Sequence, residues 1–387
     1  MRFRDQLRAL PPPIWILLGG TLVNRFGSFV MPFLAIYLTR SGHSMARAGL
    51  AVGAYGAGHV IASSLGGHLA DRIGRRNTIM LSMFGSAAAM MALSQARSYG
   101  VIVALTVLTA AVAELYRPAS HALLTDLTQA DQRVFAFALY RFAVNLGVAA
   151  GPAMAGFLVE HSFFYLFAGD ALTSFAFGVI AVLALPRGLR TYVKGERRGE
   201  ALRFAARDRA FMAFLAASLL TALIDMQMLA TFPLHIVSVG FAPRVYGMLL
   251  SLNGALIITL ELFIINYTQR LPPRPVIALG YLLWGLGFAL TGIARTIPLL
   301  AVTAMIWTMG EMVSSPLIAA HVAQIAPERF RGRYMGLLVT TWSISMMIGP
   351  PLGTFVFERN PAALWAACGV LALISVALLY TPRRPET

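Results

Sequence analysis

The chain has 387 residues, of which 58% are hydrophobic and only 12% carry a charge. Soluble domains have about 25% charged residues, so this composition excludes a soluble protein and indicates a polytopic membrane protein. The net charge of +15 does not indicate a nucleic-acid partner, because the basic residues lie in short connections between apolar stretches. The single cysteine, Cys368, excludes an intramolecular disulfide.

The apolar stretches predict membrane-spanning helices, because each is long enough to cross about 30 Å of hydrocarbon. They cover residues 14–39, 48–69, 77–96, 99–126, 134–159 and 163–185, followed by 209–239, 245–267, 275–294, 297–325, 334–357 and 361–380. The first stretch is too long for the apolar region of a signal peptide. Most Lys and Arg residues fall on the side that holds both termini, which the positive-inside rule identifies as cytoplasmic. We predict an all-α protein of the cell membrane, specifically a bacterial inner membrane.

An internal repeat relates the two halves of the chain. An offset of 198 residues places Gly151-Pro152 on Gly349-Pro350 and Pro118 on Pro316. We therefore predict an N-terminal six-helix half over residues 1–185, a cytoplasmic linker over 186–208 and a C-terminal six-helix half over 209–387. Two such halves are typical of carriers that expose one site alternately to each side of the membrane.

A charged connection follows the second predicted span. Its glycines and charged residues are Gly67, Asp71, Arg72, Gly74, Arg75 and Arg76. Ion pairs at a membrane surface can stabilise one conformation and break in another, and Asp126, at the end of the fourth span, is a plausible partner for Arg75. The alternative is that these arginines only set the topology.

The string Gly67-His-Leu-Ala-Asp71-Arg72-Ile-Gly74-Arg75-Arg76 resembles the signature loop of the major facilitator superfamily of secondary transporters. This resemblance implies twelve helices in two pseudo-symmetric halves. It also implies that the loop stabilises the outward-facing state through contacts with the fourth and eleventh helices. A monomer is the default for such carriers.

The fifth predicted span carries a second motif, which consists of Asn145, Gly147, Gly151, Pro152 and Gly156. Gly147 and Gly151 are four residues apart, so a neighbouring helix can approach closely on that face. The string resembles the antiporter motif of proton-coupled drug exporters, although Ala138 and Ala155 stand where that motif has glycines. Simple helix packing is the alternative interpretation.

Ionisable residues inside membrane spans cost about 2.5 to 3.5 kcal/mol each and are functional candidates by default. The candidates for proton coupling or substrate binding are Asp225, Glu114, Glu311, Arg25, Arg117, Arg141 and His59. Asp225 has no opposite charge within a helical turn and is suited to exchange a proton. By depth, Arg25 pairs best with Glu114 or Asp225, whereas Asp170 is expected near the opposite surface from Arg141. A static ion pair or hydrogen bond is the alternative for the acids, as is a structural role for His59.

The resemblance implies a secondary active transporter and not an enzyme. Our leading hypothesis is proton-coupled efflux of drug-like or amphipathic small molecules, with protons, the small molecule and membrane lipid as partners. No cofactor or metal is expected, because the sequence lacks a phosphate-binding loop and a metal-ligand motif. The alternative is a proton-coupled importer of a small organic solute or anion that binds to Arg25, Arg117 and Arg141.

Overall fold

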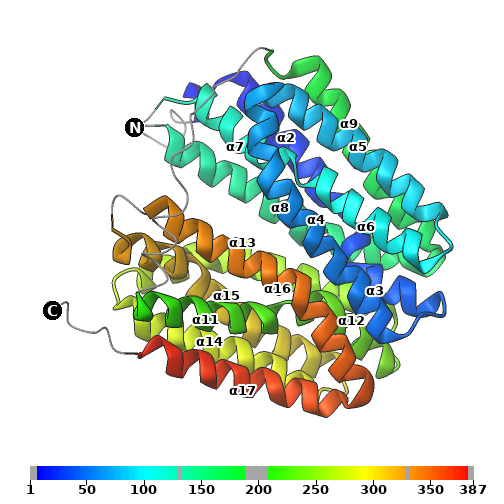
Figure 1. Cartoon of the computed structure of the whole chain (residues 1–387), viewed down its shortest axis with the longest axis vertical. Helices are drawn as coiled ribbons and strands as arrows, with labels where there is room; N and C mark the ends of the chain where they lie inside the picture. Colours follow the sequence, from blue (N-terminus) through cyan, green and yellow to red (C-terminus); the bar gives the residue numbers. More distant parts are fainter. Residues whose placement is uncertain (1–6, 130–131, 188–207, 328–330, 382–387) are drawn as a thin grey trace. The chain divides into compact units, whose positions relative to one another are not determined.

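The computed structural model describes residues 7–129, 132–187, 208–327 and 331–381. Over these ranges the regular structure is entirely α-helical (Figure 1). Twelve segments are long and apolar enough to cross a membrane. The prediction of an all-α fold with twelve membrane spans is therefore confirmed. The predicted linker lies almost wholly outside the described residues.

The helices begin and end close to the predicted positions, within three residues at each span end. The first six spans comprise α2 (Pro12–Phe26), α3 (Val30–Arg40), α4 (Met45–Arg72), α5 (Arg75–Gln95), α6 (Tyr99–Ala113), α7 (Tyr116–Leu127), α8 (Arg133–His161) and α9 (Phe163–Ala184). The last six comprise α11 (Arg209–Asp225), α12 (Gln227–Ser238), α13 (Pro243–Thr268), α14 (Pro273–Thr291), α15 (Ile297–Ile325), α16 (Arg331–Arg359) and α17 (Pro361–Leu379).

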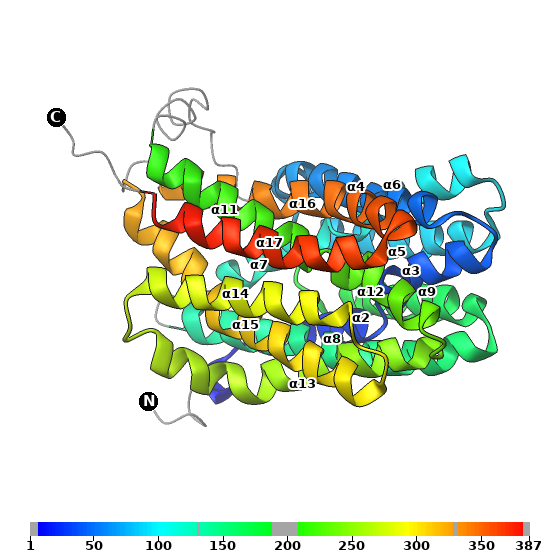
Figure 2. The ribbon, with the colours of Figure 1, turned by 90° about the horizontal axis from the view of Figure 1, so that it is seen from below.

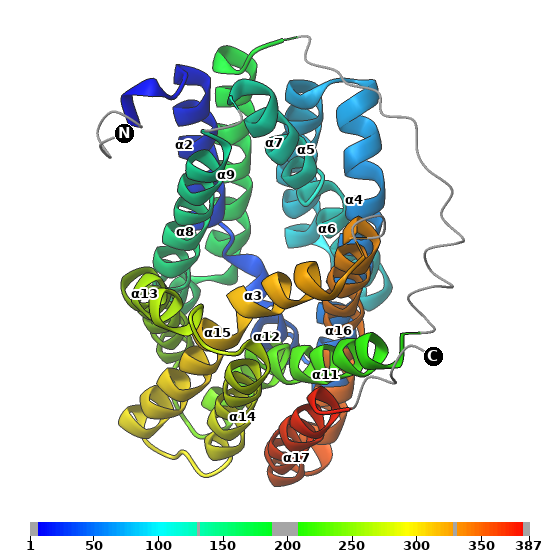
Figure 3. The same ribbon diagram turned by 90° about the vertical axis from the view of Figure 1, so that its left-hand side faces the viewer.

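The chain forms two compact units, each built from three segments. The first unit contains residues 1–37, 54–194 and 242–254, and the second contains 38–53, 195–241 and 255–387. In the first unit α2 packs along α8 and α9 (Figure 3). In the second unit α14 lies between α15 and α17 (Figure 2). The predicted division of the chain at the linker stays a prediction.

Three spans are each built from two helices, with a break near the middle of the span. The first span breaks between α2 and α3, the fourth between α6 and α7, and the seventh between α11 and α12. Proline contributes to the first two breaks. Pro32 and Pro118 are each the third residue of the second helix, and each lacks the N–H that would bond the carbonyl four residues earlier, at Ser28 and Glu114.

The charged connection after the second span is shorter than we predicted. Helix α4 continues through Arg72, so Gly67 and Asp71 lie in its last turns and not in a loop. A helix keeps its own backbone hydrogen bonds after it leaves the hydrocarbon, so polar residues can extend it. Only Ile73 and Gly74 connect α4 to α5, and the φ of +95° at Gly74 permits this sharp turn.

Candidate functional site

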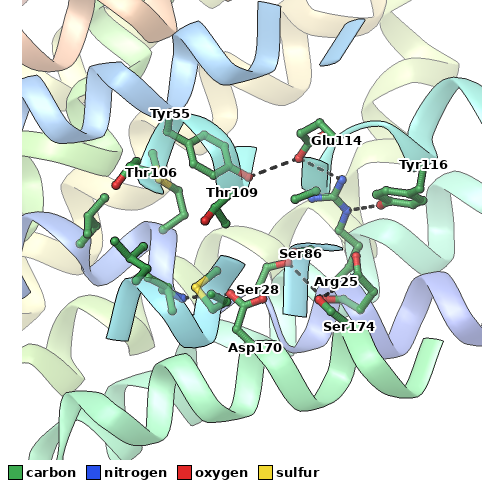
Figure 4. A pocket seen from close by; sticks show the side chains of 17 residues that line it. Arg25, Ser28, Tyr55, Ser86, Thr106, Thr109, Glu114, Tyr116, Asp170 and Ser174 are labelled. Carbon is green, nitrogen blue, oxygen red and sulfur yellow. Dashed lines mark hydrogen bonds and ion pairs between the residues drawn. The ribbon is translucent and has the colours of Figure 1, made fainter. Parts of the chain in front are cut away.

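Glu114 lies at the break in the fourth span and is the centre of a group of ionisable side chains, which we name the Glu114 cluster (Figure 4). Its Oε1 atom lies 3.6 Å from Arg25 Nη2 and accepts a hydrogen bond from Tyr55 OH at 3.5 Å. Its Oε2 atom lies 3.3 Å from Arg117 Nη1 and 3.8 Å from His59 Nε2. The Glu114 side chain is only 8% exposed. Side chains from α2, α4 and α7 therefore converge on one buried carboxylate.

Packing between α2 and α8 positions Arg25 in this cluster. A Cβ atom at Gly147 would lie 2.7 Å from Arg25 Cβ, and one at Gly151 would lie 2.4 Å from the carbonyl oxygen of Phe26. Only glycine permits this approach. Arg25 Nε donates a hydrogen bond of 2.7 Å to Tyr116 OH. The glycines of the fifth-span motif thus place α2 so that Arg25 reaches Glu114 and Tyr116.

A cavity lies beside the Glu114 cluster, within the first unit (Figure 4). It contains about 550 Å³ of space between the lining atoms, part of it open. Hydroxyl groups of Ser28, Ser86 and Thr109 share its wall with the apolar side chains of Met31 and Leu34. The wall therefore combines many polar and charged groups with a smaller set of apolar side chains, so it can contact both the polar and the apolar part of a small molecule.

Asp170 also belongs to this site, although we did not assign it there from the sequence. From its depth we expected Asp170 near the surface opposite Arg141 and gave it no partner; the structure places it in the cavity wall, with 7% of the residue exposed. Its Oδ2 atom accepts a hydrogen bond of 3.4 Å from the backbone N–H of Val30, the first residue of α3. The two residues are 140 positions apart, so no local pattern could have indicated this contact.

The second unit contains the other predicted acids. Asp225 is the last residue of α11, at the break in the seventh span, and is 6% exposed. The carboxylate of Glu311, on α15, is close enough to act electrostatically on Asp225, and the indole of Trp284 lies beside it. The structure therefore brings these two acids together.

The fifth-span contact recurs at the equivalent position of the second unit. Gly349 of α16 faces the side chain of Met226, which is the residue at the break in the seventh span. Gln227 Nε2 donates a hydrogen bond of 3.2 Å to the Gly349 carbonyl. In each unit, a glycine followed by proline contacts the residues at a broken span.

The charged turn after α4 forms a compact polar network. Arg75 is 4% exposed, and its Nη1 lies 2.6 Å from Asp71 Oδ1 while its Nε lies 3.2 Å from Asp126 Oδ2. Arg76 donates hydrogen bonds to the carbonyls of Ala181 and Val182 at the end of α9. Arg72 is exposed. Arg75 thus links α4, α5 and α7 through two carboxylates.

The structure does not bring every predicted residue to the cavity. Arg141 is exposed on α8 and does not line the cavity, and Arg117 reaches Glu114 with 44% of its side chain exposed. Gly156 faces the backbone of Arg244 on α13, so it serves close packing. Among the described residues, no group of three or more His, Cys, Asp or Glu side chains could hold a metal ion.

The sequence also matches a known family over its whole length. Residues 17–242 and 229–387 match the model described as Major Facilitator Superfamily. The chain belongs to this superfamily. It is accordingly a multi-pass membrane transporter, and the family that the charged motif indicated is confirmed.

Several relatives of this transporter are known. An uncharacterized MFS-type transporter, YqjV of Bacillus subtilis (strain 168), is 27% identical and covers 97% of this chain and 95% of its own. A Na(+), Li(+), K(+)/H(+) antiporter of Planococcus maritimus is 25% identical, with 90% of each chain covered. The multidrug resistance protein MdtH of Edwardsiella ictaluri (strain 93-146) is 25% identical, with 95% of this chain and 93% of MdtH covered.

A solved structure of a peptide transporter, POT, has the same fold. Its TM-score is 0.81 at 18% identity, with 95% of this chain and 94% of that chain covered. At this identity the likeness concerns the fold alone.

Proposed function

We propose that this transporter exports drug-like or amphipathic small molecules in exchange for protons by alternating access. One observation carries the proposal: a buried carboxylate lies at the break of a membrane span in each unit, Glu114 in the first and Asp225 in the second. Interrupted membrane helices are where secondary transporters bind substrates and coupling ions, because the break exposes polar backbone groups.

The two carboxylates have different surroundings and therefore suit different roles. Glu114 is paired with Arg25 and Arg117, so its charge is balanced. Asp225 faces Glu311, which carries the same charge. Two carboxylates in one buried site favour the uptake of a proton. We assign proton coupling to Asp225 with Glu311, and substrate binding or its control to the Glu114 cluster.

The relatives support the proposed direction and substrate class. The names of MdtH and of the Planococcus antiporter indicate multidrug resistance and cation exchange against protons in those proteins. The resemblance of the fifth-span motif to that of drug exporters agrees with them. The cavity beside Glu114 has apolar wall residues such as Met31 and Leu34, which suit an amphipathic molecule.

One observation favours a second candidate function, proton-coupled uptake of a small organic anion. The Arg117 guanidinium contacts Glu114 and is 44% exposed, so its remaining N–H groups are accessible to an anion. Of the three predicted arginines, only Arg25 lines this cavity, and Arg117 adjoins it through its contact with Glu114.

The test is transport into inverted membrane vesicles that hold a pH gradient. The panel contains lipophilic cations, neutral amphiphiles and organic anions, and the variants are Asp225→Asn and Glu114→Gln. Exposed Glu160, which lies 3.3 Å from Arg244 on the same unit, provides the matched control Glu160→Gln. Gradient-dependent accumulation of cations or neutral amphiphiles that is lost in Asp225→Asn, but not in Glu160→Gln, would support the proposal. Accumulation of anions alone, or accumulation that survives collapse of the gradient, would contradict it.

A further inference from the structure

Two side chains of α9 accept hydrogen bonds from the chain on either side of the break in the first span. Asn24 Nδ2, before the break, donates a hydrogen bond of 3.1 Å to Ser174 Oγ. Val30 N, after the break, donates one of 3.4 Å to Asp170 Oδ2. The two contacts bracket residues 27–29, which lie outside both helices. Helix α9 therefore bonds the chain on both sides of the break.

Close packing reinforces these hydrogen bonds. A Cβ atom on Gly27 would lie 1.8 Å from Thr173 Oγ1, and one on Gly169 would lie 2.8 Å from the ring of Phe29. The break and α9 are thus in direct contact, with small residues on both sides. A change in the angle between α2 and α3 must alter the Asp170 contact.

Asp170 contributes the only ionisable side chain to this contact among the described residues 24–30 and 169–174, apart from Arg25. An ionised carboxylate at the start of a helix is stabilised by the free N–H groups and by the helix dipole. A neutral carboxyl group accepts a much weaker hydrogen bond from the same N–H group. The strength of the bond to Val30 therefore depends on whether Asp170 holds a proton.

The carboxylate of Asp170 also interacts with the charged groups at the cavity. Arg25 acts electrostatically on Asp170 and also lies 3.6 Å from Glu114. Tyr55, which donates a hydrogen bond to Glu114, interacts with Asp170 as well. Arg25 and Tyr55 are the titratable groups that face Asp170 from α2 and α4. With both acids ionised, Arg25 and Arg117 are balanced; a proton on Asp170 leaves one positive charge in excess.

We propose that Asp170 is a proton-binding site whose occupancy sets the angle between α2 and α3. Loss of a proton strengthens the Asp170 bond to Val30 and stabilises the bent first span. Uptake of a proton weakens that bond and removes a counter-charge from Arg25, so the first span changes its angle. The inference rests on proton coupling in the proposed function, but it is independent of the substrate and of Asp225.

The first test observes the proton directly. Infrared difference spectra of the purified protein in lipid bilayers, recorded between acidic and alkaline pH without substrate, report protonated carboxyl groups. We expect a carboxyl band that is present in the wild type, in Asp225→Asn and in Glu114→Gln, and absent in Asp170→Asn. Asparagine keeps the size and an acceptor oxygen but cannot titrate. Spectra of Asp170→Asn identical to those of the wild type would overturn the proposal.

The second test measures the angle of the first span. Spin labels at Trp15, on an exposed face of α2, and at Arg40, the last residue of α3, give the distance between the two ends in a Cys368→Ala background. We expect this distance to depend on pH in the wild type and to stay at its acidic value in Asp170→Asn. Thr173→Val is the matched control, because it changes the same contact without a titratable group. A pH-independent distance in the wild type, or loss of the pH response in Thr173→Val, would overturn the proposal.

These tests separate the inference from the proposed function. If the infrared band and the distance change are found but no drug-like compound is exported, Asp170 remains a proton site and only the substrate class is wrong. If export is found without either signal, the export proposal stands and Asp170 has a structural role.

Discussion

Substitution of Gly151 by alanine tests whether close contact between α8 and α2 is required. The added methyl group would lie 2.4 Å from the carbonyl oxygen of Phe26, whereas ordinary contacts between nonbonded heavy atoms are about 3.5 Å. The neighbour is backbone and cannot rotate away, so α2 must move by about 1 Å. Overpacking of this kind costs about 1 to 3 kcal/mol, and the better helix propensity of alanine returns about 0.5 to 1 kcal/mol.

Gly19→Ala provides the control for the propensity effect. Gly19 lies within α2 and no heavy atom would approach within 4 Å of its added Cβ. This variant should be more stable than the wild type by about 0.5 to 1 kcal/mol. The difference between the two variants therefore isolates the overpacking cost of about 1 to 3 kcal/mol. Unfolding in mixed detergent micelles, followed by circular dichroism, gives both free energies. Equal stabilities of Gly151→Ala and Gly19→Ala would refute the argument.

Three further predictions concern the charged turn and the Glu114 cluster. Gly74→Ala should lower the free energy of unfolding by about 1 to 3 kcal/mol, because its φ of +95° and ψ of 155° are almost restricted to glycine; an unchanged unfolding curve would contradict this. Glu114→Gln should cost about 3 to 5 kcal/mol, because Arg25 loses the carboxylate with which it forms a buried ion pair. The double variant Arg25→Met, Glu114→Met should recover most of this loss in the same assay. Arg75→Gln should slow transport about tenfold, because the variant loses the charged hydrogen bonds to Asp71 and Asp126. Arg72→Gln, at an exposed position, is the control. Equal transport rates in the two variants would indicate that both arginines only set the topology.

The membrane spans could be predicted from the sequence because each depends on a local property. A stretch of apolar residues must form its hydrogen bonds internally in the hydrocarbon, so its length and composition determine a helix. The span from 297 to 325 was predicted with the bounds that α15 has in the structure. Ends were less accurate where polar residues continued a helix, as at Asp71 and Arg72 on α4.

The breaks were not predicted, although two had a signal in the sequence. Pro32 and Pro118 each leave one carbonyl without its usual donor. Pro152 and Pro316 do the same, yet α8 and α15 continue through them without a break. Proline alone therefore does not distinguish a break from a continuous helix. The contacts of each helix with its neighbours decide, and those contacts join residues distant in the chain.

The candidate site, too, could be predicted only in part from the sequence. Residue type and depth correctly singled out Arg25 and Glu114 as possible partners, and the structure places them 3.6 Å apart. Depth alone did not indicate the contact of Asp170 with Val30, because that contact depends on the break in the first span. Arg141 is exposed on α8 and does not line this cavity, so its predicted role stays a prediction. The direction of a side chain depends on helix rotation, which an apolar span with a weak periodic pattern does not specify.

The internal repeat shows that the two proposed proton sites, Asp170 and Asp225, do not occupy equivalent positions. The offset of 198 residues places Gly27 on Asp225, and it places Asp170 on Cys368. In the first unit, the carboxylate at the break therefore comes from a neighbouring helix and accepts a hydrogen bond from Val30. In the second unit, the carboxylate belongs to the broken span, and the buried thiol of Cys368 occupies the position equivalent to Asp170. A proton at Asp170 changes a bond between helices, whereas a proton at Asp225 changes the charge that faces Glu311. The two proposals thus assign different physical responses to the two units: a proton at Asp170 would control helix geometry in the first, and a proton at Asp225 would be the coupling ion in the second.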